Sequence, residues 1–261
     1  MKVTVVMRFP LIQNAIWKRK IIDELIKKKV ETSIVFAESS YLNQFKFGLK
    51  NLGPSLFRKR KEVASKSNIK LYDYFKRKIS VRKVNNLNGY YSKTVITSLR
   101  PDYILLLGSG IVRTNILEIP SLGTLHCHIG KLPEMRGTNT VHWSVLLKKN
   151  LYLSMRNVDS GIDTGSIISL SKIDYSNSKS IDSIYEKCYS EMPKIIVNTI
   201  VNRKSTEEIT FDNISDPLTY DNLEKDGLNS ELKKDRQYFS MHPFLKGITE
   251  SMLAHEKTSQ K

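Results

Sequence analysis

The sequence predicts an α/β protein: a Rossmann-like, mostly parallel twisted sheet with helices on both faces, plus a small C-terminal appendage. One observation is the β-α-β opening, in which a helical apolar pattern separates two short β-rich runs within 36 residues. Another is the uninterrupted apolar run at 103–107, which is typical of a central parallel strand buried on both faces. A chain of 261 residues, 40% hydrophobic and 26% charged, is also long enough to bury a sizeable core.

The amino-terminal elements follow from apolar spacing. Residues 3–7 are rich in β-branched side chains and predict a first strand, and the alternating residues 30–36 predict a second. Between them, residues 14–29 place apolar side chains at helical spacing. Residues 40–67 are basic and predict a helical segment broken near Gly53, and residues 69–72 predict a short third strand.

The remaining elements are predicted in the same way. Helices are expected at 86–99, 140–148 and 183–201, and strands at 103–107, 123–128, 151–157 and 166–171. After residue 202 the chain turns polar and loses apolar periodicity. We therefore divide it into a large domain at 1–204 and a small C-terminal extension at 205–261, with the last residues frayed.

The formal charge of +16 is concentrated in the first third of the chain. Residues 1–90 hold 21 Lys and Arg against 6 Asp and Glu, whereas the other 171 residues are almost balanced. Solvated helix faces explain this pattern as well as an anionic ligand, a membrane surface or nucleic acid does. Charge alone does not separate these readings.

Other features favour a cytoplasmic protein without a membrane span. No window reaches the ~18 apolar residues of a membrane helix. The first residues have no small-residue cleavage site behind them, so they predict a strand and not a signal peptide. Cys127 and Cys188 form no metal-ligand or disulfide pattern.

Three segments are candidates for chemistry because ligands of open α/β sheets bind beyond the carboxyl ends of the strands. The first is Gly108-Ser109-Gly110, where a plain tight turn is an equal alternative. The second is 126–128 with the loop at 130–137, and the third is 159–165. We expect all three to follow strand ends.

His126 and His128 should lie on the same side of their strand, with Cys127 opposite. Such a pair can supply two metal ligands, but a third would have to come from Asp159, Asp163 or His142. We therefore expect no metal. Cys127 is interpreted as a small buried hydrophobe and not as a nucleophile.

The motifs GTLHCH, LPEMRG and DSGIDTG occur in this order between residues 123 and 165. Their order and spacing resemble the core of the folate-dependent formyltransferases, a family that includes methionyl-tRNA, glycinamide ribonucleotide and sugar-nucleotide formyltransferases. The likeness is strong over residues 100–170 and thin elsewhere. It implies 10-formyltetrahydrofolate as the formyl donor.

The resemblance also implies a catalytic trio of Asn, His and Asp. The family's His falls on His128 and its Asp on Asp163, while His126 occupies the Asn position. His128 would carry the proton, Asp163 would orient it, and His126 would stand in for the amide that binds the oxyanion. Alternatives are a formyl-folate hydrolase, a different acyl donor, or a catalytically silent protein that binds nucleic acid or another partner on the same fold.

Donor-binding positions are likewise carried over from the family. Its pattern assigns the pterin pocket to Gly108, Ser109, Gly110 and Ile111, the folate-side wall to Leu132 and Pro133, and further contacts to Arg136, Gly137 and Asp159. For Arg136 we favour hydrogen bonds to its own loop over ligand contact. Trp143 is expected in the core.

The acceptor is predicted from the C-terminal extension. It is too short and too weakly strand-patterned for the tRNA-binding domain of methionyl-tRNA formyltransferases, although the basic first half keeps nucleic acid open. Residues 236–243 resemble a segment of the sugar N-formyltransferases. We therefore expect a nucleotide-linked amino sugar of a polysaccharide pathway as acceptor; a homodimer is left open.

Overall fold

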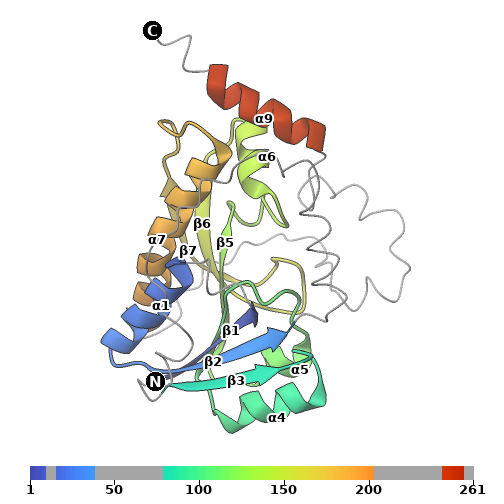
Figure 1. The fold of residues 1–261 in the computed structure, drawn as a ribbon, viewed down its shortest axis with the longest axis vertical. Coiled ribbons are helices and arrows are strands. Elements are labelled where there is room, and N and C mark those ends of the chain that lie inside the picture. The colour runs from blue at the N-terminus through green and yellow to red at the C-terminus, as the bar shows by residue number, and fades with distance from the viewer. Residues whose placement is uncertain (10–15, 39–78, 203–242, 256–261) are drawn as a thin grey trace, which may run out of the picture.

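A seven-stranded sheet forms the centre of the molecule (Figure 1). The computed structural model describes residues 1–9, 16–38, 79–202 and 243–255. Its strands are β1 (Lys2–Phe9), β2 (Glu31–Glu38), β3 (Ser80–Val84), β4 (Tyr103–Leu106), β5 (Gly123–Ile129), β6 (Leu151–Asn157) and β7 (Ile167–Ile173). They are arranged in the order β3-β2-β1-β4-β5-β6-β7. The first five run parallel, as predicted.

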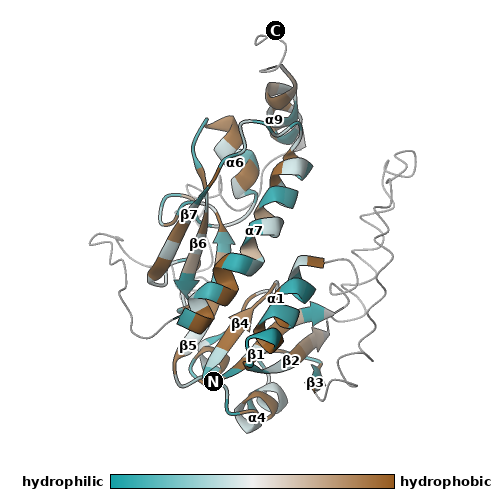
Figure 2. Cartoon of the chain, turned by 90° about the vertical axis from the view of Figure 1, so that its left-hand side faces the viewer, coloured by the Kyte–Doolittle hydropathy of each residue, from teal (hydrophilic) through white to brown (hydrophobic). Residues whose placement is uncertain are grey.

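Helices cover both faces of this sheet. They are α1 (Ile16–Lys27), α4 (Tyr90–Ser98), α5 (Thr114–Leu117), α6 (Thr140–Leu146), α7 (Ile181–Asn202) and α9 (Pro243–His255). Alternate residues of β1 point to two separate cores: Val5 packs in the core under α1 and α7, and Val6 packs in the core under α4 and α5. The wholly apolar β4 lies between these cores (Figure 2). The predicted fold class is therefore confirmed.

Two amino-terminal details differ from expectation. The third strand of the sheet is β3, whose residues Ser80–Val84 include two exposed basic side chains and gave no clear strand signal. The helix expected at 86–99 begins only at Tyr90. The basic segment at 40–67 and the strand expected at 69–72 lie outside the described residues.

The direction of β6 corrects the expected location of the third candidate segment. Strand β6 runs antiparallel to β5, with Asn157 opposite Leu125 and Leu153 opposite Ile129. Its carboxyl end therefore lies beside the first half of β5, not beside the end that carries His128. The segment 159–165 reaches the histidines because the chain turns back after β6.

Helix α9 was not anticipated from the polar C-terminal sequence. It packs against α6 at one end of the molecule (Figure 1), and its residue Leu253 is buried in the core that α7 covers. The division at residue 204 stays a prediction. Among the described helices, none combines the length and apolarity needed to cross a membrane.

Candidate active site

Strand β5 presents both histidines of the GTLHCH motif on the same face. His128 is buried, His126 is half-buried, and Cys127 points into the core on the opposite face. The two imidazole rings lie 6.4 Å apart between centroids and are tilted by 51°. The expected alternation along the strand is confirmed.

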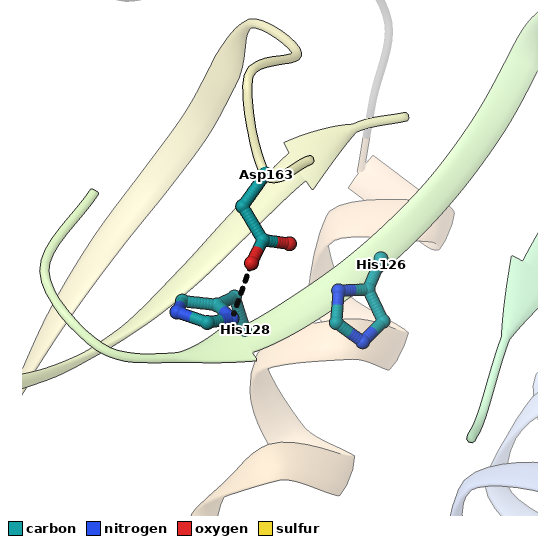
Figure 3. Close-up of side chains that lie close together, drawn as sticks. All are labelled: His126, His128 and Asp163. Carbon is teal, nitrogen blue, oxygen red and sulfur yellow. Dashed lines mark ion pairs between the residues drawn. The ribbon is translucent and has the colours of Figure 1, made fainter. Parts of the chain in front are cut away.

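The hydrogen bond of His128 fixes its neutral tautomer. Its Nε2 lies 2.7 Å from the carbonyl oxygen of Met135. A carbonyl oxygen only accepts hydrogen bonds, so Nε2 carries the proton and Nδ1 of the neutral ring keeps its lone pair. This Nδ1 faces Oδ2 of Asp163 at 3.6 Å (Figure 3). That separation is too long for a direct hydrogen bond, so the lone pair of Nδ1 and the carboxylate oxygen face each other without one.

Asp163 is held by contacts from two other segments. Its Oδ2 accepts a hydrogen bond from the Gly137 N–H at 2.8 Å, and its Oδ1 pairs with Nη2 of Arg156 at 2.6 Å. The backbone of Asp163 is left-handed, with a φ of 55°, which is uncommon for residues other than glycine. The turn after β6 therefore aims a carboxylate back toward β5.

Arg156 is the site residue that sequence reasoning missed. It lies on β6 directly opposite His126 in the strand register, and only 5% of its surface is exposed. The available signal was a single charged residue, Arg156, in a strand whose sequence is LYLSMRN. A buried guanidinium needs an anionic partner, and Asp163 provides it.

The charges around Asp163 determine how the trio titrates. Burial lowers the pKa of His128 below its usual value, with a further contribution from Arg156, against the opposing effects of Asp163 and Met135. Burial and the adjacent Arg156 lower the pKa of His126 to about 3. Burial alone would raise the pKa of Asp163, but the neighbouring His128, Arg156 and His126 together hold it below its usual range. At neutral pH the site holds two neutral imidazoles and a charged carboxylate.

The loop after β4 lies beside this trio because Leu106 is paired with His126 in the sheet. Two cations hold the loop: Arg8 donates to the carbonyl of Ser109 at 3.0 Å, and Lys18 donates to that of Leu107 at 2.6 Å. Burial lowers the pKa of Lys18 to about 8. Gly110 has a φ of 78°, and a Cβ atom there would collide with the Arg8 guanidinium.

The outer edge of the same loop is open to ligands. Gly108, Gly110 and Ile111 are exposed. The backbone N–H groups of Ser109, Gly110 and Ile111 have no hydrogen-bond partner within the described part of the chain. A planar heterocycle with carbonyl and ring-nitrogen acceptors is a suitable partner for such groups.

The other residues predicted to bind the donor differ in burial and in hydrogen bonding. Leu132 is fully buried, and its N–H bonds to Ser154, which also donates to the Gly130 carbonyl. Arg136 is half-buried and makes no hydrogen bond to its loop among the described residues, contrary to expectation. Asp159 accepts hydrogen bonds from Gly161 and Thr164, which is a turn-stabilising role. Trp143 is buried, as predicted.

The chain is similar in sequence to proteins of known function over part of its length. No family model matches the chain. The methionyl-tRNA formyltransferase of Desulforamulus reducens is 29% identical over 125 residues, which is 47% of this chain and 39% of that protein. The methionyl-tRNA formyltransferase of Prochlorococcus marinus strain MIT 9215 is 25% identical over 199 residues, 70% of this chain and 58% of its own length. The matched regions thus cover well under two thirds of these relatives.

Solved structures share the fold. A sugar N-formyltransferase from Shewanella sp. superposes with a TM-score of 0.57 at 11% identity, covering 97% of this chain and 87% of that one. The phosphoribosylglycinamide formyltransferase of Bacillus halodurans gives a TM-score of 0.55 at 12% identity, covering 80% and 100%. The fold is thus a formyltransferase-type Rossmann-like domain. The sequence relatives in turn show that the chain is similar to folate-dependent formyltransferases over part of its length.

Proposed function

We propose that the chain transfers a formyl group from 10-formyltetrahydrofolate to the amine of a nucleotide-linked amino sugar. The observation that carries the proposal is the buried contact of His128 with Asp163, 3.6 Å apart, at a strand end beside an open loop. A neutral imidazole facing a charged carboxylate is suited to accept a proton. The likeness to methionyl-tRNA formyltransferases and to the formyltransferase fold supports 10-formyltetrahydrofolate as the donor.

The reaction needs three tasks from the protein. The amine nitrogen bonds to the formyl carbon and forms an oxyanion; as the oxyanion collapses, the carbon's bond to the folate nitrogen breaks, and that nitrogen takes the proton held by His128. His128 accepts the amine proton at Nδ1, the ring atom that its Met135 bond leaves free. Asp163, next to that atom, stabilises the resulting imidazolium.

His126 is assigned to the oxyanion. Its low pKa keeps the ring neutral at physiological pH, so it offers one N–H donor. Burial of the ring strengthens such a hydrogen bond relative to water. His126 thus replaces a two-hydrogen amide with a single donor, and we expect catalysis with reduced efficiency at this step.

The donor is placed along the loop after β4. The unpartnered backbone N–H groups of Ser109, Gly110 and Ile111 would bind the pterin, and the buried Leu132 and its neighbour Pro133 would border the folate side. Arg8 and Lys18 keep the loop in position from the protein side. These residues fit a folate because they combine open backbone donors with an apolar wall.

Two acceptors are supported by different observations. The fold likeness to a sugar N-formyltransferase, which covers 97% of this chain, favours an amino sugar. The sequence relatives are methionyl-tRNA formyltransferases, and the strongly basic residues 1–90 would suit a phosphate-rich acceptor of either kind. We favour the sugar because the fold likeness to a sugar N-formyltransferase covers nearly the whole chain, and because residues 236–243 resemble a segment of such enzymes in sequence.

A mass-spectrometric panel tests this proposal. The full chain is incubated with 10-formyltetrahydrofolate and UDP-, dTDP- and GDP-linked amino sugars, with initiator methionyl-tRNA in a parallel reaction. Formylation of one sugar by the wild type and not by His128→Asn supports the proposal. Formylation of the tRNA alone would overturn the acceptor and keep the reaction. Loss of formyl from folate without a formylated acceptor would replace the transferase with a hydrolase.

A further inference from the structure

In contrast to the expectation of no metal from the sequence, the geometry points to a transition-metal site formed by His126, His128 and Asp163, which would bind zinc-type divalent cations. One donor atom from each of the three side chains lies within 4.8 Å of the other two. Two imidazole nitrogens and one carboxylate oxygen are a common ligand set for such ions. The inference concerns binding only and does not depend on formyl transfer.

The hydrogen bond of His128 to Met135 prepares one ligand atom. Metal-binding histidines usually donate their second ring N–H to a carbonyl or carboxylate, which fixes the tautomer and aims the lone pair. Nε2 of His128 makes such a bond at 2.7 Å, so Nδ1 presents its lone pair to the space beside Asp163. The lone pair of Nδ1 and Oδ2 of Asp163 are 3.6 Å apart, so both can reach a single cation.

His126 supplies the second nitrogen. Its Nδ1 is enclosed by protein and has no hydrogen-bond partner among the described residues. Figure 3 shows a ring nitrogen of His126 on the side that faces His128 and Asp163. Ligand atoms of a tetrahedral zinc ion lie about 3.4 Å apart, given Zn–N and Zn–O bonds of about 2.1 Å. The His128–Asp163 pair, at 3.6 Å, is close to this separation, and the donor atom of His126 lies within 4.8 Å of both.

Arg156 determines which ions are favoured. It neutralises Asp163 through Oδ1 and leaves Oδ2 toward the histidines. With the carboxylate charge already paired, ions that depend on charged oxygen ligands, such as Mg²⁺ and Ca²⁺, gain little here. Ions that bond well to imidazole, such as Zn²⁺ and Co²⁺, keep two strong ligands.

Occupation of the site would matter for the reaction proposed above. The ion would use the same Nδ1 lone pair of His128 that accepts the amine proton. On that proposed function, a zinc-type ion is an inhibitor of the chain, and its effect arises from the histidine at position 126.

Direct binding measurements test the inference on the full chain, stripped with a chelator and kept free of folate and acceptor. We expect one equivalent of Zn²⁺ to bind in calorimetry, and Co²⁺ to give the visible absorption of a nitrogen-ligated, low-coordinate ion. His126→Asn removes one ligand and should weaken Zn²⁺ binding at least about 100-fold. His142→Asn, which changes a buried histidine on α6, is the matched control and should bind as the wild type does.

His126→Asn is the decisive variant because His126 is half-buried and its Nδ1 makes no hydrogen bond, so the change should be tolerated by the fold. Its folding is checked by thermal unfolding without metal. Absence of Zn²⁺ binding by the wild type at millimolar metal would overturn the inference, as would tight binding that His126→Asn leaves unchanged. Either result is independent of whether formyl transfer is observed, because neither substrate is present.

Discussion

At the residue scale, two polar side chains that face each other across adjacent strands distinguish this site. His126 takes the position of the amide expected in the family's trio, and Arg156 lies opposite it in the sheet register. Burial lowers the pKa of both histidines, and Arg156, which pairs with Asp163 at 2.6 Å, lowers them further. Arg156 therefore supplies the positive charge that pairs with Asp163, while His126 stays neutral at neutral pH.

Substitution of His126 tests its role at the oxyanion. We expect His126→Ala to lower kcat by about 100-fold, because removing one oxyanion donor costs 10²–10³ in rate. His126→Asn restores an N–H donor and should stay within about tenfold of the wild type. Steady-state kinetics with the acceptor found in the panel measure both. Full activity of the alanine variant would show that His126 does not touch the oxyanion.

Substitution of Arg156 tests the electrostatic control of His128. The base must be neutral to accept a proton, and its lowered pKa extends activity to pH values below 6.5. Arg156→Gln removes a positive charge beside the ring, so the pKa of His128 rises. The acidic limb of kcat/KM should therefore move to higher pH.

The matched variant Arg156→Lys retains the charge and should keep the acidic limb near its wild-type position, even where the rate falls through poorer geometry. Profiles of kcat/KM from pH 5 to 8 measure both variants. An unchanged limb in Arg156→Gln would contradict the assignment of His128 as the titrating base.

At the element scale, the turn that follows β5 connects strand geometry to chemistry. Gly130 has a φ of 151°, and a Cβ atom there would lie 2.7 Å from the Met135 carbonyl oxygen and 2.8 Å from Nε2 of His128. These are the two atoms whose hydrogen bond fixes the tautomer. The absence of a side chain at position 130 is therefore a condition for the site.

Gly130→Ala should lower kcat by about 100-fold or more and reduce the free energy of unfolding by about 1–3 kcal/mol, because both a strained backbone and a close contact result. Gly247→Ala is the control: it lies in α9 with open space around the new Cβ, and a helical alanine should be neutral or stabilising. Kinetics and denaturant unfolding measure the pair. Wild-type kinetics in Gly130→Ala would show that the His128–Met135 bond is dispensable.

Element by element, apolar periodicity predicted most of the sheet and failed where tertiary context decides. Residues 151–157 were predicted correctly as a strand, yet the antiparallel direction of β6 depends on its partner and not on its own sequence. Strand β3 was missed because two of its five residues are basic and adjacent, so its sequence shows no apolar alternation. Helix α9, which packs on α6, was missed because its apolar residues follow a long polar stretch in the sequence.

For the site, the short motifs predicted that His128 and Asp163 lie close together. The residues that hold these two side chains in place are identified only by the fold. The contact of His128 with Asp163 was expected from the motifs, and the structure brings them to 3.6 Å. Arg156 could not be assigned, because its role depends on a cross-strand neighbour in β5. The Met135 carbonyl could not be assigned either, since a backbone acceptor leaves no trace in residue type.

At the scale of the whole molecule, ligand binding should stabilise the native fold. A ligand that binds only the folded chain adds about 2.7 kcal/mol at 100 times its Kd. A non-hydrolysable folate analogue should therefore raise the thermal midpoint of the wild type. His128→Asn should show a similar rise, because donor binding is assigned to the loop after β4 and not to proton transfer. No rise in either protein would contradict the assigned folate site.

The most direct test of the central claim follows the formyl carbon itself. The full chain is given 10-formyltetrahydrofolate labelled with ¹³C in the formyl group, together with the accepted amine, and both products are measured by mass spectrometry. The account predicts one labelled formamide for each tetrahydrofolate released by the wild type, and neither product above background with Asp163→Asn or His128→Asn. Equal transfer by the wild type and both variants would contradict the assignment of His128 and Asp163 as the catalytic pair.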